Sequence, residues 1–126
     1  MRSRTERPRI GNSGFGTVDV SGERVRAARA HLGRSIDIMV DSHGTFSVAE
    51  AKRFAHEVED CGLRWFEEPV NADDPVGLAE VRAATSIPIA AGESEFTRFD
   101  FLELLRAGAV DVLQPDTAIV GGITEA

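Results

Sequence analysis

The chain has 126 residues and carries 21 acidic against 14 basic side chains, which gives a formal net charge of −7. This acidic balance argues against nucleic acid as a partner, because phosphate binding requires clustered lysine and arginine. No apolar run approaches the roughly 20 residues needed to cross a bilayer. The first eight residues lack the apolar stretch of a signal peptide, and the single cysteine, Cys61, excludes an intrachain disulfide. We therefore expect a cytoplasmic protein of ordinary single-domain length.

From residue 21 onward, the sequence predicts helices and strands that alternate without interruption. Ser21 and Ser47 are expected to cap the first two helices, and Glu50 completes a capping box with Ser47. Glycines that follow three of the helices are expected to end them. The predicted helices cover residues 21–32, 47–61, 75–84 and 97–107, and the predicted strands cover residues 36–40, 64–66, 87–91 and 110–114.

Short apolar strands separated by amphipathic helices indicate an α/β fold with a parallel sheet. The sheet could be open and doubly wound, or closed into a (β/α)₈ barrel of the TIM type. An open sheet binds its ligand at one switch point, whereas here polar residues recur after every strand, which favours a barrel. A whole barrel takes about 250 residues. Four clear strands, with the tail of another at residues 7–10, therefore predict a partial (β/α) barrel over residues 1–126, as a fragment of a larger catalytic domain.

Each of the first three predicted strands leads into an acidic residue. These residues are Asp41, Glu67 and Glu93, and successive members are 26 residues apart, which is the length of one strand–helix unit. Because parallel neighbours in a sheet lie about 4.8 Å apart, the three carboxylates are expected to converge at one edge. Oxygen ligands from three points suit a hard divalent cation, above all Mg²⁺.

Further polar residues stand at the same strand ends. His43 lies two positions after Asp41 and would project to the same side, as an acid or base, or else as a solvated loop residue. Strand alternation would let only one of the adjacent Glu67 and Glu68 point inward, and Glu67 is the expected one. Asp116 ends the fourth strand and could orient a histidine or act as a base itself.

The remaining ionisable residues that stand out are expected to have structural roles. Glu95 could cap the helix that begins near residue 97, and the mid-helix His31 and His56 are expected on the surface. Lys52 is the only lysine and falls within a helix, so the strand ends hold no lysine base. Cys61 stands beside a glycine at a helix end, which favours a packed structural thiol over a nucleophile.

The polar motifs, in this order, resemble the enolase superfamily, specifically its mandelate racemase/muconate lactonizing branch. The similarity extends from about residue 11 to the end of the chain. Each motif alone is weak, but their joint spacing makes the resemblance specific. The motifs are Val40-Asp-Ser-His-Gly44, Trp65-Phe-Glu-Glu-Pro69, Ala91-Gly-Glu93 and Leu113-Gln-Pro-Asp116, followed by Gly121-Gly-Ile-Thr124.

The resemblance implies a (β/α)₇β barrel domain, of which this chain would supply the middle strand–helix units, without the N-terminal capping domain and the last strands. It implies Mg²⁺ ligation by Asp41, Glu67 and Glu93, and it gives Asp116 the place of the aspartate in a histidine–aspartate pair. The Asp-x-His motif is similar to that of acid-sugar dehydratases such as galactonate dehydratase, in which this histidine assists departure of a hydroxyl group; His43 would take that role. The implied reaction removes the proton next to a carboxylate through a metal-stabilised enediolate and then eliminates water.

Two features depart from the family pattern. Where members carry a Lys-x-Lys base motif, this sequence has Arg7 and Arg9, which could bind a substrate carboxylate but not remove a proton. The histidine that would pair with Asp116 would lie on a strand beyond residue 126.

The expected function is therefore that of a fragment of a Mg²⁺-dependent acid-sugar dehydratase, inactive by itself, whose full-length form is a homo-oligomer that binds a small carboxylate substrate. A racemase or epimerase on the same scaffold and a catalytically inactive truncated barrel are the alternatives.

Overall fold

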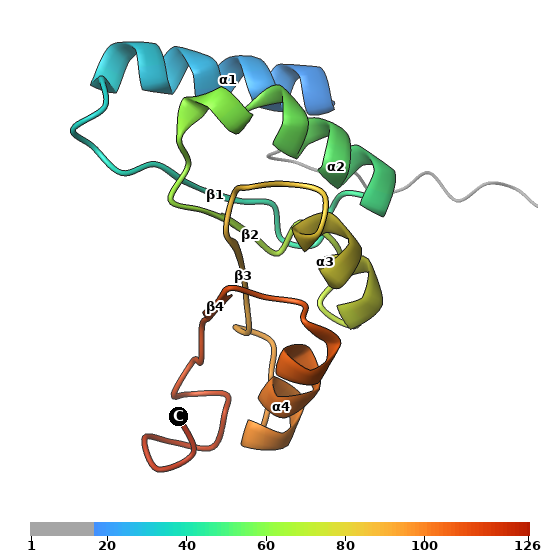
Figure 1. The fold of residues 1–126 in the computed structure, drawn as a ribbon. Helices are drawn as coiled ribbons and strands as arrows, with labels where there is room; N and C mark the ends of the chain where they lie inside the picture. Colours follow the sequence, from blue (N-terminus) through green and yellow to red (C-terminus); the bar gives the residue numbers. More distant parts are fainter. Residues whose placement is uncertain (1–16) are drawn as a thin grey trace, which may run out of the picture.

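The computed structural model describes residues 17–126 as four helices that follow one side of a four-stranded parallel sheet (Figure 1). The strands are β1 (Met39–Asp41), β2 (Trp65–Glu67), β3 (Ile89–Ala91) and β4 (Val112–Leu113). The helices are α1 (Val18–Leu32), α2 (Val48–Glu57), α3 (Pro75–Arg82) and α4 (Arg98–Ala107), with a 3₁₀ turn, η1 (Glu59–Cys61), after α2. The predicted α/β class and the alternation of elements are confirmed.

The strands pair in chain order, β1-β2-β3-β4, and all pairs are parallel. Each strand is joined to the next by a helix on the same side of the sheet (Figure 1). A doubly wound sheet would carry helices on both faces, so this arrangement corresponds to consecutive units of a (β/α) barrel. All four strands therefore end at the same edge of the sheet, and the loops that follow them lie together there.

Three phenylalanine rings join α2 to the sheet beneath β1 and β2. The ring centroids of Phe54 and Phe66 are 4.9 Å apart, and Phe46 lies 5.6 Å from Phe54. Both Phe54 and Phe66 are completely buried. Because side chains alternate along a strand, burial of Phe66 against the helices turns the next residue, Glu67, to the opposite face of the sheet.

The first helix begins one turn earlier than the sequence predicts. Thr17 is its N-cap, and Ser21, the predicted cap, lies inside the helix as a buried residue. Packing explains the difference, since Val18 and Val25 on the same face of α1 are both buried and extend the helix toward the N-terminus. None of the helices between residues 17 and 126 combines the length and the hydrophobicity that a membrane span requires.

The other predicted helix and strand boundaries differ from those of the structure by only a few residues. The capping box of Ser47 and Glu50 is confirmed. A second capping box, formed by Thr97 with the side chain of Asp100, occupies the start of α4, so Asp100 has the role that the sequence suggested for Glu95.

Strand β1 begins at residue 39 rather than 36. Ile36 is half exposed, and its carbonyl oxygen accepts a hydrogen bond from the Arg29 side chain at 2.7 Å instead of pairing with a strand.

Candidate metal centre

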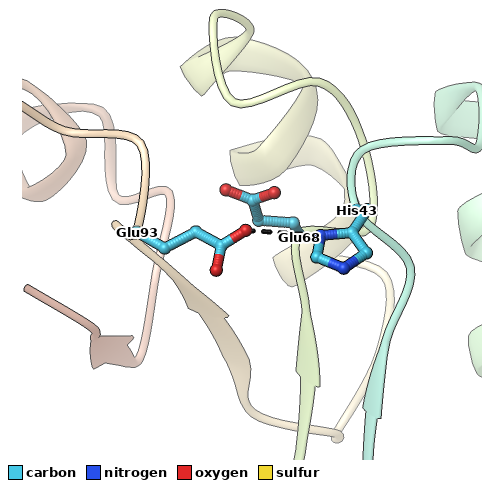
Figure 2. Close-up of side chains that lie close together, drawn as sticks. All are labelled: His43, Glu68 and Glu93. Atoms are coloured by element: carbon cyan, nitrogen blue, oxygen red, sulfur yellow. Dashed lines mark ion pairs between the residues drawn. The ribbon is translucent and has the colours of Figure 1, made fainter. Parts of the chain in front are cut away.

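The register of the sheet brings the ends of β1, β2 and β3 to one level. Asp41 pairs with Glu67, and Glu67 pairs in turn with Ala90. The turns that follow these strands carry His43, Glu68 and Glu93, whose ligand atoms all lie within 4.8 Å of one another. Figure 2 shows the three side chains converging from the three strand ends.

The imidazole of His43 lies between two carboxylates. Its Nε2 is 3.2 Å from Asp41 Oδ2, and its Nδ1 is 3.3 Å from Glu93 Oε1, the contact drawn as a dashed line in Figure 2. The backbone amide of His43 also donates to Asp41 Oδ1 at 2.8 Å. The ring thus joins two of the predicted metal ligands, Asp41 and Glu93, and its side chain remains 64% exposed, so a bound molecule could reach it.

Glu68 is the buried member of the cluster, with only 5% of its surface exposed. Burial raises the pKa of its carboxyl group, and the negative charges of Glu93 and Asp41 raise it further. His43 and a 3.4 Å hydrogen bond from the Ser94 hydroxyl act in the opposite direction. The carboxylates are close enough to disfavour the ionisation of one another. A hard divalent cation would offset this mutual repulsion, so the donor set fits such an ion.

The sequence reasoning missed Glu68. Strand alternation predicts that only one of the two adjacent glutamates, Glu67, points to the site, but the carboxylate that lies within 4.8 Å of the ligand atoms of His43 and Glu93 is that of Glu68. Alternation stops at the end of β2, because Glu68 adopts a left-handed backbone conformation with φ of 38°. Glu67 shares the face of its register partner Asp41 and accepts a hydrogen bond from the Trp65 indole at 3.1 Å. The doubled glutamate before Pro69 is the only sequence signal that could have suggested two roles.

The backbone conformation of Gly92 turns the chain after β3 so that Glu93 lies in the cluster. Its φ is 138°, and a Cβ atom at this position would lie 2.6 Å from Phe101 Cε1 and 3.1 Å from the backbone nitrogen of Gln114. Only glycine avoids both the collision and the backbone strain. The close approach of α4 and β4 therefore fixes where the chain turns toward the cluster.

Asp116 shares a pocket with Glu93 beyond the end of β4. The pocket has a volume of about 400 Å³ and is lined by Glu93, Ser94, Phe96, Asp116 and Ile119. The Asp116 carboxylate accepts a hydrogen bond from the backbone amide of Ala118 at 2.8 Å, which holds it at the turn. The predicted acid or base is thus placed next to a predicted metal ligand, with space between them for a small molecule.

The other residues singled out in the sequence lie away from this cluster wherever they fall within residues 17–126. Arg7 and Arg9 fall outside residues 17–126, so the structure does not describe them. Lys52 on α2 forms an ion pair with Glu80 on α3 at 2.8 Å. Burial raises the pKa of the Cys61 thiol, which fits the predicted structural role and not that of a nucleophile. His31 and His56 are exposed on their helices, as predicted.

The raised pKa of Glu68 predicts a pH-dependent effect of neutralising this side chain. Below the ordinary pKa of glutamate, Glu68 is protonated in both the folded and unfolded states, and its contribution to stability is fully present. As the pH rises through the raised folded-state pKa, that contribution is lost. We therefore expect Glu68→Gln to increase the free energy of unfolding at neutral pH without divalent metal, and to give a smaller increase as the pH falls toward about 4.

Urea denaturation of the metal-free protein between about pH 4 and pH 8 measures this effect. Glu23→Gln, at an exposed position on α1, is the matched control and should leave stability nearly unchanged across the range. A Glu68→Gln variant with the same stability increment at every pH would show that ionisation of the buried Glu68 carboxyl group is not the cause.

Comparison with known proteins identifies the family. Residues 7–126 match the family model described as enolase C-terminal domain-like. Over 108 residues the chain is 43% identical to D-galactonate dehydratase from Ralstonia pickettii (strain 12J), an alignment that covers 86% of this chain and 28% of the relative. The chain thus spans little more than a quarter of the length of this curated relative.

Two solved structures are also similar. An enolase from Bradyrhizobium complexed with magnesium and mandelic acid has a TM-score of 0.86 at 38% identity, over 90% of this chain and 31% of that one. L-Talarate dehydratase from Polaromonas sp. JS666, complexed with Mg and L-glucarate, has a TM-score of 0.84 at 36% identity, over 89% of this chain and 31% of that one.

Both of these structures contain magnesium, the cofactor that the sequence predicted and that enolase-superfamily enzymes use. The carboxylate cluster at the strand ends of this chain fits the same ion. Since the family match extends over nearly the whole sequence, the chain belongs to the enolase C-terminal domain-like family, within the enolase superfamily.

Proposed function

We propose that this chain provides the magnesium-binding part of an acid-sugar dehydratase, which removes the proton next to a substrate carboxylate and expels a hydroxyl group from the adjacent carbon as water. The observation that carries the proposal is the position of the His43 imidazole, which contacts both Asp41 and Glu93 at the carboxyl edge of the sheet. A proton donor directly beside the metal ligands is what the elimination of a hydroxyl group requires. The relative named D-galactonate dehydratase supports the same reaction class.

In this proposal, Asp41, Glu67 and Glu93 hold Mg²⁺, with one carboxylate from each of three neighbouring strand ends. Glu68 adds a fourth, buried carboxylate that increases the negative potential at the site. When bound, Mg²⁺ would attract the substrate carboxylate and stabilise the negative charge that develops as the proton leaves. Glu67 would have to exchange its hydrogen bond with the Trp65 indole for the ion.

His43 and Asp116, which lie beside the proposed metal ligands, would take part in the two proton transfers. As the bond between the β-carbon and its hydroxyl oxygen breaks, His43 donates a ring proton to that oxygen, which leaves as water. The electron pair of the broken C–H bond forms the new carbon–carbon double bond. Asp116, across the pocket from Glu93, orients or assists the base that accepts the α-proton. Arg7 and Arg9 would bind the substrate carboxylate.

The proposal also assigns this chain a place in a larger domain. Its four strand–helix units would be the middle units of a (β/α) barrel, to which further barrel strands and a capping domain would contribute outside these 126 residues. The coverage of 28% of the curated relative supports this assignment. The complete site, and the choice of sugar acid, would then depend on those additional segments.

A racemase or epimerase is the second candidate, favoured by the similar Bradyrhizobium structure that holds mandelic acid. Mandelic acid has no hydroxyl group on its β-carbon, so removal and return of the α-proton is the corresponding reaction for such a substrate. Reaction in D₂O distinguishes the candidates. A racemase would give deuterated substrate with its hydroxyl groups intact, whereas a dehydratase would give a 2-keto-3-deoxy acid.

Substitution of Glu93 tests the metal site. We expect Glu93→Gln to raise the dissociation constant for Mg²⁺ at least tenfold, because a neutral amide replaces one of three charged ligands. Isothermal titration calorimetry measures this change, with the exposed Glu23→Gln as the matched control. Unchanged affinity in Glu93→Gln would remove this residue from the ligand set.

Substitution of His43 tests the chemical step. In an active protein that contains these residues, we expect His43→Asn to lower the rate of keto-acid formation about 10²- to 10⁴-fold, the usual contribution of a general acid. Its affinity for Mg²⁺ should change little, because His43 is not one of the proposed ligands. His56→Asn, at an exposed position on α2, should retain full activity. Equal rates in the two variants would refute the role of His43.

A further inference from the structure

Four hydrogen bonds tie the turn after β1 to the end of β2, the longest of them from the Ser42 hydroxyl to the Glu67 carbonyl at 3.4 Å. The backbone amide of Ser42 donates to the Glu67 carbonyl at 3.1 Å, and that of Gly44 donates to the Glu68 carbonyl at 2.8 Å. The Ser42 hydroxyl donates to the same Glu68 carbonyl at 2.7 Å. We call residues 42–44 and 67–68, joined in this way, the turn clamp.

The clamp holds two residues in a conformation that non-glycine residues seldom adopt. His43 has a φ of 47° and Glu68 a φ of 38°, both in the left-handed region. Such residues cost free energy and persist only where neighbouring contacts hold them in place. These are also two of the three residues whose side chains meet in the cluster of Figure 2. The backbone of the clamp therefore determines where both side chains point.

Ser42 is at the centre of this arrangement but does not itself face the cluster. It is completely buried, so it cannot touch a substrate. Its own carbonyl accepts hydrogen bonds from the backbone amide and the hydroxyl of Thr45, at 3.1 and 2.7 Å. The turn is closely packed as well, since a Cβ at Gly44 would lie 3.0 Å from Asn71 Cα. A buried hydroxyl that bonds the backbone of a site residue is suited to hold that residue in position.

We propose that Ser42 is a positioning residue for the metal centre. Its hydroxyl fixes the backbone of Glu68, and through the clamp it fixes the relative orientation of the Glu68 and His43 side chains around the cation. The consequence for metal affinity rests on the function proposed above, whereas the consequence for the geometry of His43 does not. The two consequences can therefore be measured separately.

The first experiment measures Mg²⁺ affinity by calorimetry. We expect Ser42→Ala to raise the dissociation constant 10- to 100-fold, the usual effect of losing a hydrogen bond that supports a metal ligand, because the Ser42 hydroxyl also donates to the carbonyl oxygen of Glu67, a proposed ligand, at 3.4 Å. Ser42→Cys keeps nearly the same volume with a weaker donor and should give an intermediate value. Ser86→Ala is the matched control, because it removes a serine hydroxyl that bonds Glu59 at 2.9 Å on the exposed surface, and its affinity should equal that of the parent protein.

The second experiment records the imidazole resonances of the metal-free protein by NMR. The chain has three histidines, and two of them, His31 and His56, are exposed on helices and serve as internal references. We expect Ser42→Ala to shift the ring resonances of His43, as its contacts with Asp41 and Glu93 loosen, and to leave the other two unchanged. A variant that only lost global stability would keep all three resonances in place while folded.

The outcomes distinguish this proposal from the proposed function. Ser42→Ala with parental Mg²⁺ affinity and parental His43 resonances would overturn the role of Ser42, whatever Glu93→Gln does. Parental affinity in Glu93→Gln would instead overturn the metal site, while the His43 resonances would still decide on Ser42. If Ser42→Ala does not fold, Ser42→Cys takes its place, and unchanged His43 resonances in that variant would refute the proposal.

Discussion

The parallel register of β1, β2 and β3 is the constraint on which the site depends. It sets Asp41 beside Glu67 and brings Glu93 to the same edge, although these residues are far apart in the sequence. Burial of Glu68, together with the concentration of negative charge around it, opposes folding of the metal-free protein, as the raised pKa of this carboxyl group indicates. The same repulsion would favour a divalent cation, which offsets it. Stability without metal and affinity for metal are therefore expected to change in opposite directions when a carboxylate is removed.

Specific hydrogen bonds and close contacts hold the backbone around the cluster, although some of the side chains there are exposed. His43 and Glu68 both occupy the left-handed region, which costs about 1–3 kcal/mol for each residue. The hydrogen bonds between the two turns oppose that cost on one side of the site, and the close contact at Gly92 fixes Glu93 on the other. Beneath the sheet, the buried rings of Phe54 and Phe66 anchor the strands from which these turns emerge. A rigid sheet thus carries turns whose conformation is set by few, identifiable contacts.

Much of this arrangement could be predicted from the sequence, because periodicity and spacing are local signals. Alternating helix and strand patterns, the capping box at Ser47 and acidic residues at regular spacing were sufficient for the fold class and for the edge where the site lies. The role of Glu68 could not be predicted, because it depends on a left-handed conformation that tertiary contacts impose at the end of β2. The prediction that Ser21 caps α1 was wrong for a similar reason. Burial of Val18 extends the helix toward the N-terminus, past the residue that the local sequence indicates as its start.

The most direct test is a crystal structure of the protein grown with Mn²⁺, which replaces Mg²⁺ at oxygen sites and is located by its anomalous scattering. We predict one strong peak at the carboxyl edge of the sheet, with a carboxylate oxygen from each of residues 41, 67 and 93 about 2.1–2.2 Å from it. In that structure Glu67 would have left the Trp65 indole. A metal bound elsewhere, or a Glu67 side chain still bonded to Trp65 while the ion rests on other residues, would contradict this account.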